Sequence, residues 1–373
     1  MHYKHRYLER QIEKDLKQKM VFLGGPRQVG KTTLAKKLLK ASTGGYLNWD
    51  IAKDREAILR GELSPGQLWI FDEIHKHKPW RNYLKGLFDA HRDEHQILVT
   101  GSARLDLYRR GGDSLQGRYH YLRLHPLSVA ELGIHTAGDF LNLLTLGGFP
   151  EPFLMSSEVE AKRWSREYRT RLIQDDIVSL EQVQDLGNLE LLMIRLPNLV
   201  GSPLSINALR EDLQVSHKTV SKWLAILEHI YAIFRLSPFG APMLRAVKKE
   251  QKHYHYDWTL IKDDGYRFEN LVAAHLLKWV HFEQDAKARD LHLRYFRDVD
   301  RREVDFIIVE NDVPVIAVEC KWSDADVSRG LKYFKERFPK CRAWQISATG
   351  NKDYVSKGDI RVAPAIQFLK ELV

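Results

Sequence analysis

Short apolar runs separated by helix-like stretches fill the first third of the chain. Between residues 20 and 124, these runs cover residues 20–23, 46–49, 67–71, 96–100 and 119–124. Strands that alternate with helical segments along a chain form a parallel sheet covered by helices. The pattern therefore predicts an α/β domain with a parallel sheet over residues 1–127.

The rest of the chain has a different order of elements. Residues 128–200 are mostly helical in pattern, which indicates a lid or connector. In 201–262, two short helices precede two strand-like runs, whereas 263–373 has the order helix, three strands, helix, strand and helix. Since the chain has no internal repeat and no Ser-, Gly- or Pro-rich linker, these boundaries rest on changes of pattern. The sequence predicts four parts, 1–127, 128–200, 201–262 and 263–373.

Composition narrows the class of protein. Hydrophobic residues make up 44% of the chain, which excludes collagen-like and largely disordered proteins. The 58 Lys and Arg residues exceed the 49 Asp and Glu residues and give a net charge of +9, which favours a polyanionic partner. Two cysteines, Cys320 and Cys341, cannot form a disulfide framework. The apolar runs are shorter than a membrane span, and charged residues occur throughout the first 19 residues, which lack the apolar segment of a secretory signal. We therefore expect a cytoplasmic protein with no membrane partner.

Residues 25–32, Gly-Pro-Arg-Gln-Val-Gly-Lys-Thr, match the phosphate-binding pattern GxxxxGK[ST]. They follow the apolar run 20–23 and precede a helix-like stretch, as that loop requires. Glycines let the backbone N–H groups turn toward phosphate oxygens, and the positive end of the helix adds to the attraction. Lys31 is expected to reach the β- and γ-phosphates, and Thr32 to ligate Mg²⁺. The expected nucleotide-binding residues are Gly25, Pro26, Arg27, Gln28, Val29, Gly30, Lys31, Thr32 and Thr33.

Two further apolar runs end in polar residues. The run 67–71 ends in Asp72 and Glu73. We expect Asp72 to hold the Mg²⁺ ion and Glu73 to polarise the attacking water. The run 96–100 ends near Thr100 and Ser102, which face the γ-phosphate if their strand lies between the first two. The sequence therefore predicts ATP and Mg²⁺ as cofactors.

With these motifs, the first domain resembles AAA-type ring ATPases. In that family, a polar residue at this strand end senses the nucleotide, and an arginine from the next subunit completes the site. The resemblance implies Thr100 or Ser102 as the sensor. It implies Arg118 as the arginine, with Arg109 and Arg110 as alternatives, and any of the three is equally compatible with a plain surface role. It further implies a homo-oligomeric ring, such as a hexamer.

A pair of short amphipathic segments follows Ser205 and Ser216, both of which are suitable N-cap residues. The two segments, with the strand-like runs 231–239 and 251–258 after them, predict a winged helix-turn-helix. A basic stretch leads into the second run. The expected DNA-binding residues are His217, Lys218, Ser221, Lys222, Lys248, Lys249 and Lys252. Winged helices also serve as protein-docking or lid domains, so this alternative stays open.

Polar residues also interrupt the apolar hairpin expected near residue 311. Side chains alternate along a strand, so Glu319 and Lys321 share one face. Asp305 lies opposite Glu319 only if the turn holds three residues or a strand contains a bulge, because a two-residue turn at 311–312 alone would pair Asp305 with Val318. Two adjacent carboxylates form an oxygen site for Mg²⁺, and a neighbouring ammonium can orient or help deprotonate water. This set of residues is typical of phosphodiester hydrolysis.

This arrangement resembles the PD-(D/E)xK nuclease fold, especially the archaeal Holliday-junction resolvases, in which an upstream helix adds a glutamate. The resemblance implies a catalytic set of Glu269, Asp305, Glu319 and Lys321, with Asp305 and Glu319 as metal ligands. Gln345, on the following strand, is a candidate for a further polar contact at this site. Relatives with this fold also use the site to hold DNA without cutting it, so cleavage stays open.

As a whole, the chain resembles a prokaryotic family of AAA-type ATPases that carry a winged helix and a nuclease-like C-terminal domain. The expected function is a DNA-associated ATPase that remodels, moves along or processes DNA, including branched DNA. One alternative is a nucleotide-switched defence or toxin–antitoxin regulator whose C-terminal domain binds without cutting. Another is an ATP-regulated transcription factor. The alternating histidines His75, His77, His253 and His255 are expected to be solvated rather than bound to metal.

Overall fold

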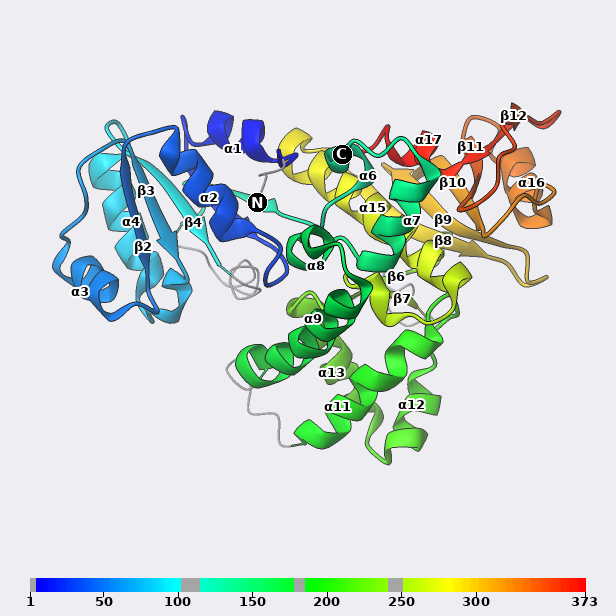
Figure 1. Ribbon diagram of the computed structural model, residues 1–373, viewed down its shortest axis with the longest axis horizontal. Helices are drawn as coiled ribbons and strands as arrows, with labels where there is room; N and C mark the ends of the chain where they lie inside the picture. Colours follow the sequence, from blue (N-terminus) through cyan, green and yellow to red (C-terminus); the bar gives the residue numbers. More distant parts are fainter. Residues whose placement is uncertain (1–4, 102–114, 178–184, 241–250) are drawn as a thin grey trace. The chain divides into compact units, whose positions relative to one another are not determined.

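The computed structural model describes residues 5–101, 115–177, 185–240 and 251–373, and the side chains of 175–177 are not described. The chain forms two compact units (Figure 1). The first comprises Met1–Pro126 with His229–Tyr231, and the second comprises Leu127–Glu228 with Ala232–Val373. The first boundary lies one residue before the expected end of the α/β domain. The division of 128–373 into three parts stays a prediction.

The first unit contains a parallel five-stranded sheet with the strand order β2-β3-β4-β1-β5. Each strand overlaps one of the five apolar runs, so the predicted parallel sheet is confirmed. All residues of β1 and β3 are buried, because a parallel sheet is covered on both faces. The strands are β1 (Met20–Gly24), β2 (Gly44–Asn48), β3 (Leu68–Asp72), β4 (Gln96–Thr100) and β5 (Tyr119–Arg123).

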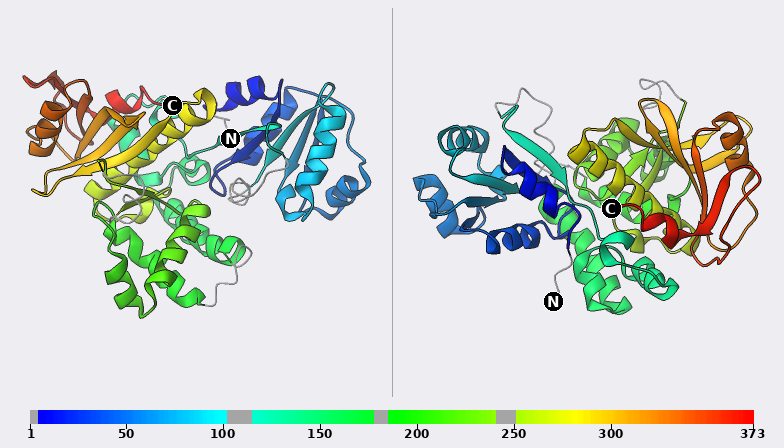
Figure 2. Two further views of the ribbon diagram at one scale, coloured as in Figure 1. Left: turned by 180° about the vertical axis from the view of Figure 1, so that it is seen from behind. Right: turned by 90° about the horizontal axis from the view of Figure 1, so that it is seen from above.

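Helices pack around this sheet and complete its core (Figure 2). Large aromatic side chains, among them Phe22, Phe71 and Trp80, fill the space between sheet and helices. Because β4 lies between β3 and β1, the carboxyl ends of these three strands meet at one edge of the sheet. The helices are α1 (Glu9–Asp15), α2 (Lys31–Lys40), α3 (Ala52–Arg60) and α4 (Trp80–His91), with the 3₁₀ turn η1 (Ile74–Lys76).

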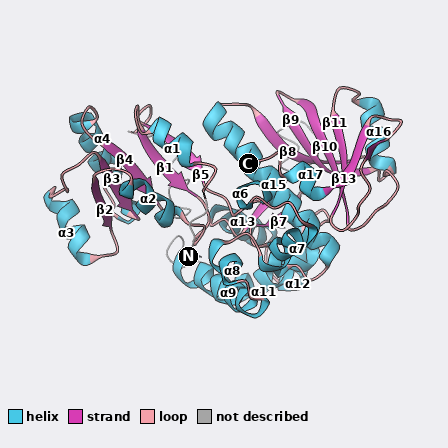
Figure 3. Ribbon diagram, turned by 45° about the horizontal axis from the view of Figure 1, so that its top comes forward, coloured by secondary structure: helices cyan, strands magenta, loops and turns pink. Residues whose placement is uncertain are grey.

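The second unit begins with helices and ends with a six-stranded sheet (Figure 3). The helical part agrees with the pattern expected for 128–200 and the start of 201–262. It consists of α6 (Val129–Leu132), α7 (Ala137–Leu146), α8 (Pro150–Met155), α9 (Glu158–Arg171), η3 (Leu172–Ile177), α11 (Leu186–Arg195), η4 (Leu196–Leu199), α12 (Ile206–Leu213) and α13 (His217–His229).

The two short helices expected after Ser205 and Ser216 are α12 and α13. The hydroxyl of Ser205 accepts a hydrogen bond from the N–H of Ala208, and that of Ser216 accepts one from the N–H of Thr219. Both predicted caps are thus formed. The antiparallel strands β6 (Ile233–Leu236) and β7 (Lys252–His255) follow. Every residue of β7 is buried, so this strand is an internal element.

The C-terminal sheet has the order β12-β13-β11-β10-β9-β8. Its first elements match the expected order of one helix, three strands, a helix and a strand. The strands β12 and β13 were not expected, since runs of two and five residues are too short to give a clear periodic pattern. The elements are η5 (Trp258–Leu260), α15 (Asp264–Lys287), β8 (Leu291–Arg297), β9 (Glu303–Glu310), β10 (Val313–Lys321), α16 (Arg329–Arg337), β11 (Arg342–Ser347), β12 (Tyr354–Val355), β13 (Ile360–Pro364) and α17 (Ala365–Leu369).

The register of the β9–β10 hairpin combines a tight turn with a bulge. Asn311 and Asp312 form a two-residue turn with φ angles of 48° and 63°, the positive values that such a turn needs. The pairing then shifts between Pro314 and Ile316, so one extra residue is accommodated in β10. Val318 therefore pairs with Phe306, and continuing this register by one residue places Asp305 opposite Glu319. The bulge is the condition that the sequence required for the two acids to share a face.

Candidate nucleotide site and acidic cluster

The segment after β1 is a loop that leads directly into α2. Gly25, Gln28 and Gly30 have φ angles of 134°, 59° and 100°, a region that disfavours most side chains. A Cβ atom on Gly25 would lie 2.2 Å from the carbonyl oxygen of Leu124, so this position requires glycine. The predicted phosphate-binding residues, 25–33, thus form one loop and the first turn of α2, where backbone N–H groups lack helical partners.

Lys31 and Thr32 begin α2 at the same edge of the sheet as the end of β3. The Lys31 side chain is buried, and its Nζ donates hydrogen bonds to the carbonyl oxygens of Gly25 (2.9 Å) and Pro26 (2.7 Å). The Thr32 hydroxyl donates to Oδ2 of Asp72 at 2.9 Å. The structure thus brings together the lysine, the hydroxyl and the carboxylate that the sequence assigned to phosphate and Mg²⁺.

Asp72 is a buried carboxylate surrounded by hydroxyl groups. Besides Thr32, the hydroxyl of Thr100 donates to Oδ1 of Asp72 at 2.6 Å, and that of Tyr46 donates to Oδ2 at 2.6 Å. Burial and the adjacent Asp72 carboxylate raise the pKa of Tyr46, which keeps its hydroxyl protonated as a donor. Thr100 contacts Asp72 because β4 lies between β3 and β1. This is the strand order that the sequence required for Thr100 to face the nucleotide site. Tyr46 was missed, because nothing local in the sequence shows that β2 lies beside β3.

Glu73 follows Asp72 in a left-handed conformation, with a φ angle of 57°. Its Oε2 atom lies 3.4 Å from Nζ of Lys76 and 3.6 Å from Nε2 of His75. Burial raises the pKa of the Glu73 carboxyl, although Lys76 opposes this shift. A carboxylate with a raised pKa is a better proton acceptor than an exposed one.

Hard oxygen donors at this edge fit a Mg²⁺ ion. The Thr32 hydroxyl and the Asp72 carboxylate are already in contact, and such oxygen atoms are the ligands that Mg²⁺ prefers. In P-loop proteins, Mg²⁺ usually retains several waters and bridges phosphate oxygens. The donor set that the structure assembles is therefore suited to a magnesium–nucleotide complex.

The side chain of Arg6 holds this loop from the side of α1. Its guanidinium donates to the carbonyl oxygen of Val29 at 2.7 Å and to the carbonyl oxygen of His125. Arg6 is 7% exposed. This buried cation links the phosphate-binding loop to the segment after β5, and no motif in the sequence indicated it.

Arg118 lies immediately before β5, whereas the phosphate-binding loop follows the opposite end of the adjacent strand β1. It forms a two-point ion pair with Asp89, with distances of 2.7 Å and 3.0 Å. Arg118 therefore does not reach the nucleotide site of its own chain. Its role as an arginine finger in a neighbouring subunit stays a prediction. Ser102, Arg109 and Arg110 lie outside the described residues.

The predicted nuclease-like residues also converge, at the start of β9 and the end of β10. Oδ2 of Asp305 accepts a hydrogen bond from the backbone N–H of Cys320 at 2.8 Å, and Nζ of Lys321 donates to Oε1 of Glu319 at 2.7 Å. Glu269, on α15, accepts a hydrogen bond from the hydroxyl of Tyr254 at 2.7 Å. Tyr254 was not anticipated.

Lys252 corrects one of the predictions. It was expected to be a surface DNA contact, but it is fully buried, so it is unavailable to DNA. Its Nζ lies 2.5 Å from Oε1 of Glu303 and 3.6 Å from Oε1 of Glu269. The distance to Oδ1 of Asp305 is 4.0 Å. The lysine that follows the basic stretch is thus the internal cation of the acidic cluster, which we define as Glu269, Glu303, Asp305 and Glu319.

The acidic cluster brings four carboxyl groups together beside Lys252 and Lys321, with Arg297 3.7 Å from Glu303. Burial and the Asp305 carboxylate raise the pKa of Glu319 to about 8, although Lys321 opposes the shift. Burial and Asp305 likewise raise the pKa of Glu269 to about 7, against the effect of Lys252. Burial also raises the pKa of Asp305. Oε2 of Glu319 is buried and has no hydrogen-bond partner among the described residues, so an oxygen ligand for a divalent cation is available beside Asp305.

The remaining predicted DNA contacts have different positions. His217, Lys218 and Lys222 are exposed on α13, and Ser221 is half-buried beside them. Lys248 and Lys249 lie outside the described residues.

Two of the lesser expectations are wrong. His75, His253 and His255 are buried rather than solvated, and burial lowers the pKa of His253 to about 4. Gln345 does not join the acidic cluster, because its amide accepts from the N–H of Ser328 and donates to the carbonyl oxygens of 325 and 326.

Three family models match successive parts of the chain. Residues 17–133 match the family model described as an AAA domain, so this part of the chain is similar to AAA-type P-loop ATPase domains. Residues 137–262 match a Domain of unknown function (DUF8612), and residues 264–368 match another (DUF4143). A search of curated proteins finds no match.

Two solved structures are distant matches. Unliganded Pif1 from Bacteroides sp is 16% identical, with a TM-score of 0.24 over 38% of this chain and 45% of that one. A Signal Transduction ATPase with Numerous Domains, with a tetratricopeptide repeat sensor, from Pyrococcus horikoshii is 15% identical, with a TM-score of 0.24. The match covers 77% of this chain, and this chain spans 48% of that protein. Among the described residues, no helix is both long and apolar enough to span a membrane.

Proposed function

We propose that the first unit binds ATP with Mg²⁺ and hydrolyses it. The observation that carries this proposal is the contact of Thr32 and Thr100 with Asp72 at the edge of the sheet where Lys31 begins α2. Three separate segments of the chain supply these groups. In the proposed reaction, they serve as the phosphate-binding and metal-binding groups of a P-loop ATPase.

Each residue has a distinct task in this reaction. Lys31 exchanges its hydrogen bonds to the carbonyls of Gly25 and Pro26 for phosphate oxygens, which adds charge attraction. Thr32 and Asp72 hold the metal, which neutralises charge on the phosphates. Thr100 orients the Asp72 carboxylate through its hydroxyl. Glu73 accepts a proton from the attacking water, a task that its raised pKa favours.

Matched variants test this assignment. Lys31→Ala is expected to abolish ATP binding measured by calorimetry, whereas Glu73→Gln is expected to bind ATP but lose hydrolysis. Lys40→Ala, at the other end of α2, is the control and should retain both activities. Wild-type protein that takes up no ATP in the presence of Mg²⁺ would contradict the proposal. So would Lys31→Ala protein that hydrolyses ATP at the wild-type rate.

For the whole chain, we propose that ATP hydrolysis is coupled to remodelling, movement along or processing of DNA, including branched DNA. Two observations support a nucleic-acid partner. The chain has a net charge of +9, and α13 exposes His217, Lys218 and Lys222 on one helix. The second unit supplies the side chains for acting on DNA, since Asp305 and Glu319 lie together beside Lys321. Together these residues form a candidate site for phosphodiester hydrolysis.

The DNA proposal is tested with single-stranded, duplex and four-way-junction DNA. We expect ATP hydrolysis to rise with at least one of these, and Mg²⁺-dependent nicking to disappear in Asp305→Asn. Hydrolysis that no DNA changes would contradict coupling. Binding without nicking would favour a nucleotide-switched regulator. A footprint confined to one sequence would favour a transcription factor.

The proposed ATPase acts as a homo-oligomeric ring, in which Arg118 enters the nucleotide site of a neighbour. The position of Arg118 at the opposite end of the strands supports a role in trans rather than in its own chain. Mixing Arg118→Ala subunits with Lys31→Ala subunits tests this role. Partial recovery of ATPase activity is expected, because a mixed ring contains sites with both residues intact. Sedimentation of the ATP-bound protein as a monomer would contradict a ring.

A further inference from the structure

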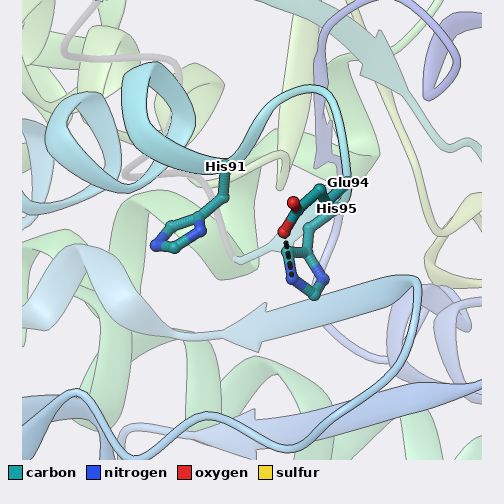
Figure 4. A group of neighbouring side chains, drawn as sticks. All are labelled: His91, Glu94 and His95. Carbon is teal, nitrogen blue, oxygen red and sulfur yellow. Dashed lines mark ion pairs between the residues drawn. The ribbon is translucent and has the colours of Figure 1, made fainter.

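Two histidines and a glutamate converge at the edge of the first unit's sheet that lies away from the phosphate-binding loop. His91 is the last residue of α4, and Glu94 and His95 lie in the turn just before β4 (Figure 4). One potential ligand atom from each side chain lies within 4.8 Å of the other two. The three residues are close in sequence, so little chain entropy is lost when they converge on one ion.

The ring of His95 is already oriented for ligation. Its Nδ1 lies 2.8 Å from the carbonyl oxygen of Gly66, and since a carbonyl only accepts, Nδ1 carries the proton. This hydrogen bond leaves the lone pair on Nε2, which lies 4.0 Å from Oε2 of Glu94. A backbone carbonyl bound to the second ring nitrogen is the usual support of a metal-binding histidine.

Packing against Trp69 holds both imidazoles in place. The His95 ring stacks on the Trp69 ring with centroids 3.8 Å apart, and the His91 ring meets Trp69 edge-on at 5.4 Å. The backbone N–H of His95 donates to the carbonyl oxygen of His91 at 2.8 Å, which closes the turn. Glu94 is the most exposed of the three, with 79% of its side chain exposed, so solvent surrounds it and rotation about its side-chain bonds can bring the carboxylate toward the two rings.

We propose that His91, Glu94 and His95 bind a divalent ion of the zinc class, with one coordination position left open. Two imidazoles and one carboxylate suit Zn²⁺ or Co²⁺, whereas Mg²⁺ prefers oxygen ligands alone. The ligand set therefore differs in chemistry from the oxygen site formed by Thr32 and Asp72. The bound ion ties the end of α4 to the start of β4, and so stabilises this edge of the ATPase sheet.

Cobalt absorption tests the site directly. Full-length protein without a histidine tag is stripped with a chelator and titrated with Co²⁺ in excess Mg²⁺, which occupies the oxygen sites. We expect one Co²⁺ per chain with the intense visible bands of a low-symmetry, tetrahedral-like complex, and its displacement by Zn²⁺. His91→Ala and His95→Gln are each expected to lose this saturable signal. The control His135→Ala, an exposed histidine elsewhere, should keep it.

Folding of the variants is checked independently. ATP binding of His91→Ala should match the wild type, its metal-free thermal unfolding should remain a single cooperative transition, and Zn²⁺ should raise the unfolding temperature of the wild type alone. The proposal is overturned if wild-type protein shows no saturable Co²⁺ binding. It is also overturned if both histidine variants keep the wild-type stoichiometry and spectrum, since the ion then binds elsewhere.

Discussion

Each unit of this protein contains a buried lysine at its candidate site, and the two lysines are held differently. In the first unit, Nζ of Lys31 donates to the carbonyl oxygens of Gly25 and Pro26. In the second unit, Nζ of Lys252 lies among carboxylates, 2.5 Å from Glu303 and 3.6 Å from Glu269. Both side chains are buried.

Because of this difference, Lys31 can exchange its hydrogen-bond partners for a ligand, whereas Lys252 is fixed among its carboxylates. Carbonyl dipoles attract an ammonium less strongly than carboxylates do, so Lys31 can turn to a phosphate while its former partners remain neutral. If Lys252 moved away, the buried Glu269 and the half-buried Glu303 and Asp305 would lose this cation. Burial alone lowers the pKa of Lys252, but Glu269, Asp305 and Glu303 outweigh burial and raise it. We therefore expect Lys31 to bind a ligand and Lys252 to stabilise the folded acidic cluster.

The largest effect is expected from Lys252→Met. Removing one member of a buried ion cluster costs about 3–5 kcal/mol, because the remaining charges lose their partner. Denaturant unfolding at pH 7 should show this loss in the second unit, and added Mn²⁺ should recover more stability in the variant than in the wild type. Lys218→Met, at an exposed position, is the matched control. An unchanged unfolding midpoint would show that Lys252 does not compensate the cluster.

The next effect is a dependence of stability on pH. The pKa of Glu269 is raised to about 7 and that of Glu319 to about 8, from an ordinary 4.5. The folded unit therefore retains protons that the unfolded chain has released. This contribution is fully present below pH 4.5 and is lost as pH rises through 7 and 8. Metal-free protein should lose a few kcal/mol across this range, measured by denaturant unfolding.

Glutamine variants provide the control for that pH dependence. Glu269→Gln combined with Glu319→Gln should flatten the stability profile between pH 5 and 8. A profile as steep as that of the wild type would assign the titration to other groups. Saturating Mg²⁺ should also flatten the wild-type profile, because bound metal replaces the protons.

A smaller effect is expected from Arg6→Ala in the first unit. Hydrogen bonds from a charged donor contribute about 1.5–3 kcal/mol, and Arg6 donates to the backbone carbonyl of Val29 within the phosphate-binding loop and to that of His125 after β5. The variant should unfold more easily and bind ATP more weakly, since the loop loses support. Arg10→Ala, an exposed neighbour, should change neither quantity. If Arg6→Ala binds ATP with unaltered affinity, Arg6 contributes only to the stability of the fold.

The smallest effect belongs to Tyr46→Phe. This change removes one of three hydroxyl donors to Asp72 and should cost about 1 kcal/mol of stability. Thr32 and Thr100 still orient the carboxylate, so the ATPase rate should fall by less than about tenfold, which corresponds to about 1.4 kcal/mol. Tyr266→Phe is the control. A loss of hydrolysis comparable to that of Glu73→Gln would show that Tyr46 acts on the nucleotide itself.

Much of the nucleotide site could be predicted, because its groups follow strands whose ends meet. Asp72 and Thr100 terminate neighbouring parallel strands, and apolar runs mark those strands clearly. Tyr46 and Arg6 could not be predicted, since their partners depend on strand order and on where α1 packs. In the second unit, the basic context of Lys252 suggested a surface contact. That prediction failed because exposure depends on the packing of β7, which charge in the sequence does not reveal.

Local patterns by themselves determined the five parallel strands, the phosphate-binding loop and the helix caps at Ser205 and Ser216. These features depend on neighbouring residues, whose spacing is written directly in the chain. Only the tertiary structure decided that a bulge near Pro314 brings Asp305 opposite Glu319 and that Lys252 lies within their cluster. The reason is physical: pairing register and burial arise from contacts between distant segments, and one extra residue in a strand changes which side chains meet.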